Sequence, residues 1–138
     1  MKKEESLIEE VYHKIKETGK IDENIKHSLL KVFGKRFENA LKALEEGAVK
    51  KYVFEPSGRV VWIVVGKERD YQIIPSVNYC SCDDFYFRVL DGGTCVCYHV
   101  LAQKLAEALN RYELITESDS FYDLLMKEWR FIREETVE

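Results

Sequence analysis

CSCDDFYFRVLDGGTCVCYH, residues 80–99, contains two short pairs of residues that can bind a metal ion. The first pair is Cys80-Ser-Cys82, the second is Cys97-Tyr-His99, and residues 83–96 separate them. Thiolate sulfur and imidazole nitrogen are the ligands that zinc prefers in a closed tetrahedral site. The stretch therefore predicts a zinc ion held by Cys80, Cys82, Cys97 and His99.

The spacing within each pair constrains the local backbone. Residues i and i+2 of a regular strand lie too far apart to share one ion, so Cys80 and Cys82 should lie on a tight turn at a strand end. Residues two apart in a helix point nearly opposite ways, so Cys97 should lie at or just before the first turn of a helix. Four closed ligands leave no open position for water or substrate, which predicts a structural zinc ion.

Cys95 competes with these ligands because it extends the second pair to Cys95-x-Cys97-x-His99. Three roles are open for it: replacement of Cys97, exchange with a ligand, or burial as a small hydrophobic side chain. We favour the buried, non-ligand interpretation.

Length and composition indicate one globular domain. The chain has 138 residues, of which 46% are hydrophobic and 33% charged, and its size is typical of a single domain. No apolar stretch is long enough to span a membrane, and the first ten residues lack the apolar region of a secretory signal. All four cysteines fall within residues 80–97, which favours metal over disulfides. We expect a cytoplasmic protein, nucleoid-associated, or nuclear if eukaryotic.

The charge distribution is a poor match to a protein that binds nucleic acid alone. The formal net charge is −4, and residues 111–138 hold eight acidic and four basic side chains, whereas residues 49–79 hold five basic and three acidic ones. Binding to a phosphate backbone needs several clustered cations. A nucleic-acid surface shared with a partner is still compatible with this profile.

Residues 1–48 are predicted to form three helices with no motif that carries chemistry. Apolar residues at helical spacing predict a helix over 4–17. Asp22 is a good N-cap for the second helix, which Gly34 ends, and the third runs from about Lys35 to Glu46 before Gly47.

Residues 49–79 are predicted to form an antiparallel sheet. The strands are Val49–Phe54, Arg59–Val65 and Tyr71–Tyr79. Glu55-Pro56-Ser57-Gly58 favours a type I turn closed by a left-handed glycine. Short connections predict a three-stranded antiparallel meander. The nearly continuous apolar run of the second strand predicts that both of its faces are covered.

The C-terminal segment carries a further amphipathic helix, and the sequence does not show what its apolar face packs against. Its apolar stripe consists of Phe121, Leu125, Trp129 and Ile132. Such a stripe can close the core or bind in the groove of a partner protein. We favour the core, with partner binding as the alternative.

These elements together predict an α+β fold. Helices come first, then a three-stranded antiparallel β-meander, a zinc-binding turn-loop-helix unit and a C-terminal helix. The whole chain, 1–138, is expected to be one domain. Its parts are a helical region at 1–48, the sheet at 49–79, the zinc unit at 80–110 and the C-terminal helix at 111–138.

The metal-binding pattern resembles the SWIM zinc-finger family, whose signature is C-x-C, a variable gap, then C-x-H. The chain is more similar to one branch, the single-domain SWIM subunit of Shu-type homologous-recombination complexes. The similar segments are CSCDDFYFRVL at 80–90, CYHVLA at 97–102, Phe33-Gly34 and PSGR at 56–59. Two departures are Asp83, where the branch often has proline, and Cys95, where it often has an aliphatic residue.

The resemblance implies a non-enzymatic partner subunit of a RecA-like recombinase paralogue ATPase, which promotes homologous recombination and DNA repair. It implies one structural zinc ion, contact with nucleic acid through the complex, no membrane and no small-molecule substrate. Two other classes stay open. One is a direct single-stranded-DNA-binding zinc module. The other is a thiol redox protein using Cys80 and Cys82, which requires exposed thiols of low pKa.

Overall fold

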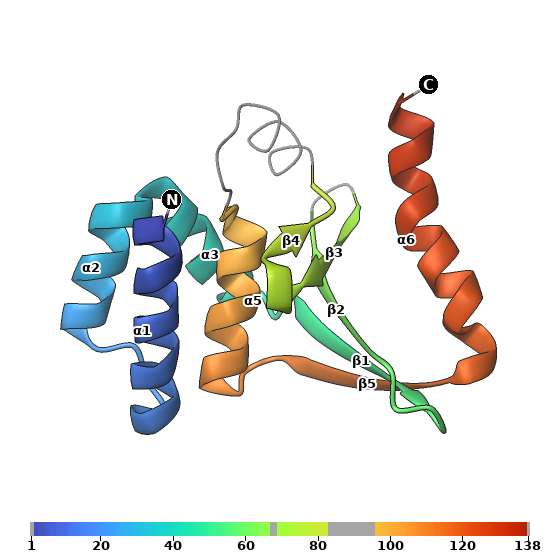
Figure 1. Cartoon of the computed structure of the whole chain (residues 1–138), viewed down its shortest axis with the longest axis horizontal. Coiled ribbons are helices and arrows are strands. Elements are labelled where there is room, and N and C mark those ends of the chain that lie inside the picture. The colour runs from blue at the N-terminus through green and yellow to red at the C-terminus, as the bar shows by residue number, and fades with distance from the viewer. Residues whose placement is uncertain (1, 67–68, 83–95, 138) are drawn as a thin grey trace.

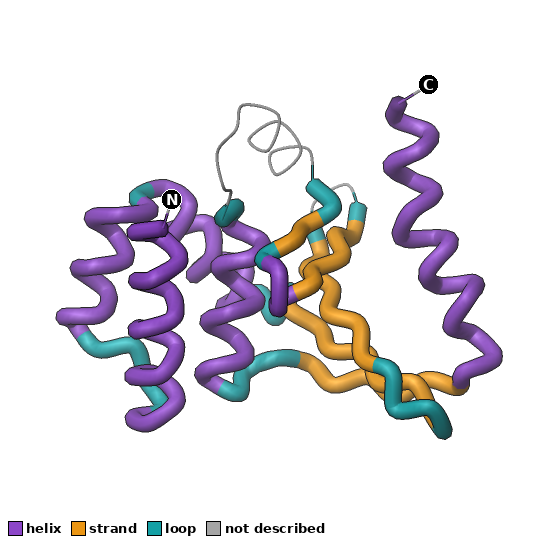
Figure 2. The backbone as a smooth tube through the Cα atoms, viewed as in Figure 1, coloured by secondary structure: helices purple, strands orange, loops and turns teal. Residues whose placement is uncertain are grey.

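The computed structural model describes the backbone of residues 2–66, 69–82 and 96–137, and their side chains up to Trp129 apart from Lys2 (Figures 1 and 2). The helices are α1 (Lys2–Thr18), α2 (Glu23–Phe33), α3 (Lys35–Glu45), α5 (Tyr98–Leu109) and α6 (Tyr122–Val137). The strands are β1 (Val49–Glu55), β2 (Val60–Val65), β3 (Asp70–Ile74), β4 (Tyr79–Cys80) and β5 (Glu113–Ser118). Two short 3₁₀ helices, η1 (Pro75–Val77) and η2 (Asp119–Phe121), join some of them.

The three N-terminal helices begin and end where their capping residues predict. The Asp22 carboxylate accepts a hydrogen bond from the backbone N–H of Ile25 at 2.8 Å and caps α2. Gly34 separates α2 from α3 with φ of 56°, and Gly47 follows α3 with φ of 67°. Positive φ strains residues that carry a Cβ atom, so glycine permits both helix ends.

The sheet has five strands in the order β4-β3-β2-β1-β5, so the fold class α+β is confirmed but the three-stranded antiparallel meander is incomplete. β1, β2 and β3 pair antiparallel as predicted. β5 pairs with β1 in parallel, which makes the sheet mixed. The sequence predicts only a helix for residues 111–138. The sequence of β5, ELITES, has just two apolar residues and no hairpin turn beside it, so the local strand signal is weak.

The third predicted strand, residues 71–79, is divided in two. Pro75 lacks a backbone N–H and starts η1, and Asn78 adopts a left-handed conformation with φ of 53°. The chain thereby reverses, and β4 pairs antiparallel with β3 through Ile73 and Cys80. This reversal places the first metal-ligand candidate at the sheet edge.

β2 is covered on both faces, as its apolar sequence predicts. Trp62 and Val64 belong to the larger core, which includes buried residues of α1, α2, α3 and α5. Val61 and Ile63 alternate with them and belong to a second core that includes Trp129 of α6. Figure 1 shows α6 on the opposite side of the sheet from the other helices. The sheet is therefore the middle layer of the molecule.

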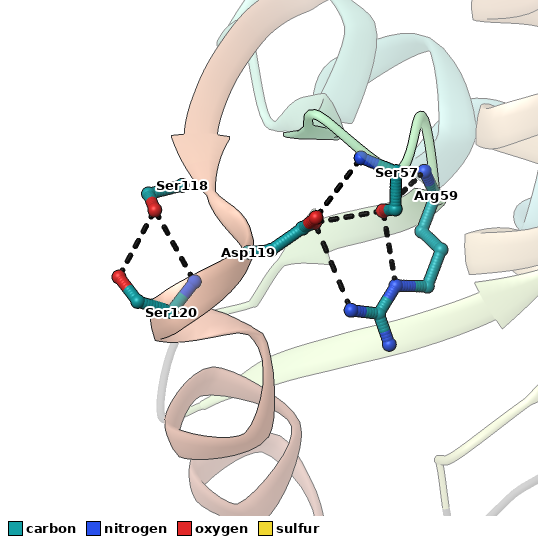
Figure 3. A network of polar contacts seen from close by, with 5 residues as sticks. All are labelled: Ser57, Arg59, Ser118, Asp119 and Ser120. Atoms are coloured by element: carbon teal, nitrogen blue, oxygen red, sulfur yellow. Dashed lines mark hydrogen bonds and ion pairs between the residues drawn. The ribbon is translucent and has the colours of Figure 1, made fainter.

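A polar cluster joins the turn between β1 and β2 to the start of α6 (Figure 3). The carboxylate of Asp119 accepts hydrogen bonds from the Ser57 backbone N–H at 2.9 Å and from the Ser57 hydroxyl at 2.7 Å. The Arg59 guanidinium lies 3.7 Å from that carboxylate and 3.7 Å from the centre of the Tyr122 ring. Gly58 has the expected left-handed φ of 80°, but its backbone N–H donates to the carbonyl of Phe54 at 2.7 Å, one residue further back than in a type I turn over residues 55–58.

No helix in the described ranges has both the length and the apolar character required to cross a lipid bilayer.

Replacing Trp129 with alanine should lower the free energy of unfolding by about 3–5 kcal/mol, because the indole is buried in the second core. Leu124, on the same helix, is 62% exposed, so Leu124→Ala should change the free energy of unfolding by less than about 0.5 kcal/mol. Urea unfolding of both variants measures the difference. Equal effects would contradict the placement of α6 against the sheet.

The Asp119 cluster predicts a pH-dependent contribution to stability. Hydrogen bonds from Ser57 lower the pKa of Asp119 below its ordinary value of 3.8. The contribution should be fully present above about pH 4 and disappear as the pH falls through the lowered folded-state pKa. The gap in melting temperature between wild type and Asp119→Asn should therefore narrow only below about pH 4. A gap that is unchanged at about pH 2 would show that the charge of Asp119 does not contribute.

Candidate metal centre

The four predicted ligands lie together in a buried cluster. Cys80 ends β4, Cys82 lies in the bend that follows, Cys97 is the N-cap of α5, and His99 lies in its first turn. Their candidate ligand atoms all lie within 4.8 Å of one another, and all four residues are buried. Both expectations from the spacing are met: the first pair is on a turn after a strand, and the second begins a helix.

The first pair is held by the neighbouring strand. Ser81, between the two cysteines, donates its backbone N–H to the carbonyl of Gln72 at 3.1 Å. The backbone N–H of Gln72 donates in turn to the Ser81 hydroxyl at 3.0 Å. These two bonds extend the contact between β3 and β4 through the bend, so the backbone between Cys80 and Cys82 has a defined position.

The second pair is shaped by the start of α5. Cys97 is extended (φ −73°, ψ 168°), and its carbonyl accepts the first helical hydrogen bond, from Leu101, at 3.1 Å. Helical geometry begins only after Cys97. The side chains of Cys97 and His99 therefore need not point in nearly opposite directions, as residues two apart within a helix do. The Cys97 sulfur lies 3.8 Å from Nδ1 of His99.

This geometry fits a tetrahedral zinc ion. Bonds of about 2.3 Å to sulfur and about 2.0 Å to nitrogen place two ligand atoms about 3.6 Å apart. The separation of 3.8 Å between the Cys97 sulfur and His99 Nδ1 is close to that value. Nε2 of His99 is buried without a hydrogen-bond partner in the described parts of the chain. Only one ring nitrogen binds an ion, and either Nδ1 beside the Cys97 sulfur or the unpartnered Nε2 can serve as the ligand atom.

The sulfurs need a cation to ionise in this environment. Burial, with hydrogen bonds to Cys82 and Cys97, raises the pKa of Cys80 far above its ordinary range. For Cys97, the hydrogen bond with Cys80 lowers the pKa, but the hydrogen bond with Cys82 and burial outweigh it and raise the pKa to about 12. Zinc binds thiolates rather than thiols, so binding here must release protons and supply the compensating charge.

The predicted stripe of α6 is divided between core and surface. Trp129 is buried, its ring centre 5.1 Å from that of Tyr52, and Leu125 is half-buried beside it. Phe121 is 49% exposed. The side chain of Ile132 lies outside the described residues, as does Cys95. The core interpretation therefore fits Leu125 and Trp129, and partner binding stays a prediction for Phe121.

Leu124 is an exposed apolar residue that the sequence reasoning missed. It is 62% exposed in the first turn of α6, three residues after Phe121, which ends η2. The predicted stripe runs from Phe121 to Leu125 in a step of four residues, and that step passes over Leu124.

The chain is similar to zinc finger SWIM domain-containing protein 7 of Mus musculus, with 33% identity over 132 residues that cover 94% of this chain and 86% of the mouse protein. It belongs to the family of zinc finger SWIM domain-containing protein 7. The Homo sapiens protein of that name is 30% identical over 127 residues, covering 90% of each chain. The Dictyostelium discoideum homolog is 32% identical over 107 residues, which cover 76% of this chain and 69% of that protein.

No family model matches the chain, and no solved structure matches it significantly. The assignment of this SWIM protein therefore rests on the named relatives and on the buried cluster of three cysteines and one histidine, which fits a SWIM zinc site.

Substitution of the cluster should abolish metal binding and lower stability together. Cys82→Ser should lose zinc, because a neutral hydroxyl replaces one of the four ligands, and the cooperative unfolding transition should move to lower temperature. Cys95→Ser is the control and should retain zinc, because Cys95 is predicted to be a non-ligand. Metal analysis and thermal unfolding of both variants test this. Loss of zinc from Cys95→Ser with retention in Cys82→Ser would contradict the proposed ligand set.

Proposed function

We propose that this protein is a zinc-stabilised, non-enzymatic subunit that binds a RecA-like recombinase or recombinase-paralogue ATPase and promotes homologous recombination and DNA repair. The observation that carries the proposal is the similarity to SWIM domain-containing protein 7 relatives over most of the chain, together with the ligand pattern of the Shu-type branch.

The zinc ion is proposed to be single and structural. Cys80, Cys82, Cys97 and His99 would fill a tetrahedral coordination shell and leave no position for a substrate or a reactive water. Since all four residues are buried, the free energy of metal binding would contribute directly to folding. In this proposal the metal stabilises the fold and does no chemistry.

The surface proposed to contact the partner includes Phe121 and Leu124. Both are large apolar side chains, Phe121 at the end of η2 and Leu124 in the first turn of α6, and they are 49% and 62% exposed. Phenylalanine is enriched at the centre of protein interfaces, and Leu124 would extend the apolar contact around it. Residues 111–138 are acidic on balance, so a basic surface around an apolar pocket on the partner is the expected complement.

Direct binding of single-stranded DNA is less well supported. Two cations of the sheet region are already engaged: Lys50 pairs with Glu113, and Arg59 pairs with Asp119. Their charges are partly neutralised, which weakens the basic character that the sequence suggests for this region. The raised pKa values of Cys80 and Cys97 weigh against the thiol redox alternative, because buried thiols of high pKa are poor nucleophiles.

Affinity capture of the tagged protein from its native cells, with nuclease treatment, tests the proposed partner. We expect a stoichiometric RecA-like ATPase that survives the nuclease. Capture by the double variant Phe121→Ala/Leu124→Ala should fall at least about tenfold, since the proposal makes these side chains interface hot spots, whose truncation costs about 2 kcal/mol or more. Both side chains are exposed, so the melting temperature should change little.

Val77→Ala supplies the matched control, because Val77 is 67% exposed but lies in η1, away from α6. It should capture the partner normally. Recovery of DNA-dependent contacts alone, with an affinity that falls steeply as salt is added, would instead favour the DNA-binding alternative.

A further inference from the structure

Arg36, the second residue of α3, joins three parts of the chain that are distant in sequence. Its Nη1 atom donates a hydrogen bond to the backbone carbonyl of Val96 at 2.8 Å. Nη1 and Nη2 also bind the two carboxylate oxygens of Glu4 in α1, at 3.2 and 2.6 Å. Val96 directly precedes Cys97, and sixty residues separate it from Arg36. We infer that Arg36 is a positioning residue for the second ligand pair, Cys97 and His99.

The contacts of Arg36 are well protected from solvent. The side chains of Arg36 and Glu4 are 20% and 18% exposed, so this pair is shielded far more than ordinary surface ion pairs. A fork of two parallel bonds between guanidinium and carboxylate restricts orientation as well as distance. The guanidinium also lies 4.9 Å from the centre of the Phe33 ring, which limits its movement further.

A hydrogen bond to the Val96 carbonyl restricts the position of the next residue, the candidate ligand Cys97. The C=O of Val96 and the N and Cα atoms of Cys97 belong to one planar peptide unit. A hydrogen bond that fixes the carbonyl oxygen therefore restricts the plane in which the Cys97 Cα atom lies. The Val96 side chain is 1% exposed, so packing holds the same unit from another direction.

The two ligand pairs thus have separate supports. Ser81 is held by Gln72 of β3, which positions the first pair from the sheet. Arg36 holds the peptide before Cys97, which positions the second pair from the N-terminal helices. Because residues 83–96 separate the pairs in sequence, their relative placement must come from such long-range contacts. This inference rests on the proposed zinc site and adds Arg36 and Glu4 to it as outer residues.

Arg36→Gln tests the inference through metal affinity. Competition with a chromophoric chelator should show a loss of zinc affinity of about tenfold or more, in the range seen when groups that orient metal ligands are removed. Zinc should also leave the loaded variant faster after addition of excess chelator. Bound Co²⁺ should give a weaker tetrahedral absorption band, because a displaced Cys97 distorts the coordination geometry.

Three further variants separate positioning from general destabilisation. Lys35→Gln removes the neighbouring cation, which is 81% exposed, and should bind zinc as the wild type does. Leu7→Ala removes a half-buried side chain of α1 that packs on the same core, and should lower stability without distorting the Co²⁺ spectrum. Glu4→Gln should have a smaller effect than Arg36→Gln. The double variant Glu4→Gln/Arg36→Gln should be no worse than Arg36→Gln, because Glu4 acts through Arg36.

An Arg36→Gln variant with wild-type zinc affinity and Co²⁺ spectrum would overturn the inference. The inference would also be overturned if Leu7→Ala, at the same loss of stability, weakened zinc binding as much as Arg36→Gln does. General destabilisation would then explain the effect of Arg36→Gln. Zinc binding by the wild-type protein tests the proposed zinc site itself. If the wild type binds no zinc, both the zinc site and the role of Arg36 are overturned. If the wild type binds zinc and Arg36→Gln binds it equally well, only the role of Arg36 is overturned.

Discussion

The burial of three thiols and one imidazole within 4.8 Å of one another is the constraint on which the rest of the structure depends. Without a cation, the protein environment holds the pKa of Cys80 and Cys97 above the ordinary range of a thiol. A divalent ion would reverse this preference and join β4 to the start of α5. Since α5 packs against α1 and α3, the ion would couple the sheet edge to the helical layer.

The two faces of the sheet pack against different helices. One face carries the large core, in which Trp62 lies together with Cys80, Cys97 and residues of α5, so the metal site is part of the main core. The other face is covered by α6 through a smaller core around Phe54 and Trp129. The Asp119 cluster fixes the point where α6 begins. Both cores therefore contribute to stability, and the exposed side chains of Phe121 and Leu124 are the proposed partner contacts.

Local chemistry predicted the features that depend on a few neighbouring residues. Asp22 and Gly34 mark helix ends because capping and positive φ are properties of single positions. The cluster of four candidate ligands could be predicted because zinc requires particular residue types at close spacing. The features missed depend on contacts between distant segments: β5 pairs with β1, and Arg36 meets Val96 across sixty residues. An amphipathic stripe likewise shows that α6 buries a face, but not that the sheet covers it.

X-ray absorption at the zinc edge, on protein purified without added metal, tests the central claim most directly. The account predicts one zinc ion with three sulfur ligands at about 2.3 Å and one nitrogen ligand at about 2.0 Å. Four sulfur ligands would mean that Cys95 takes the place of His99, and an oxygen ligand would indicate an open site able to do chemistry. Either result, or an absence of zinc, would contradict the closed structural centre described here.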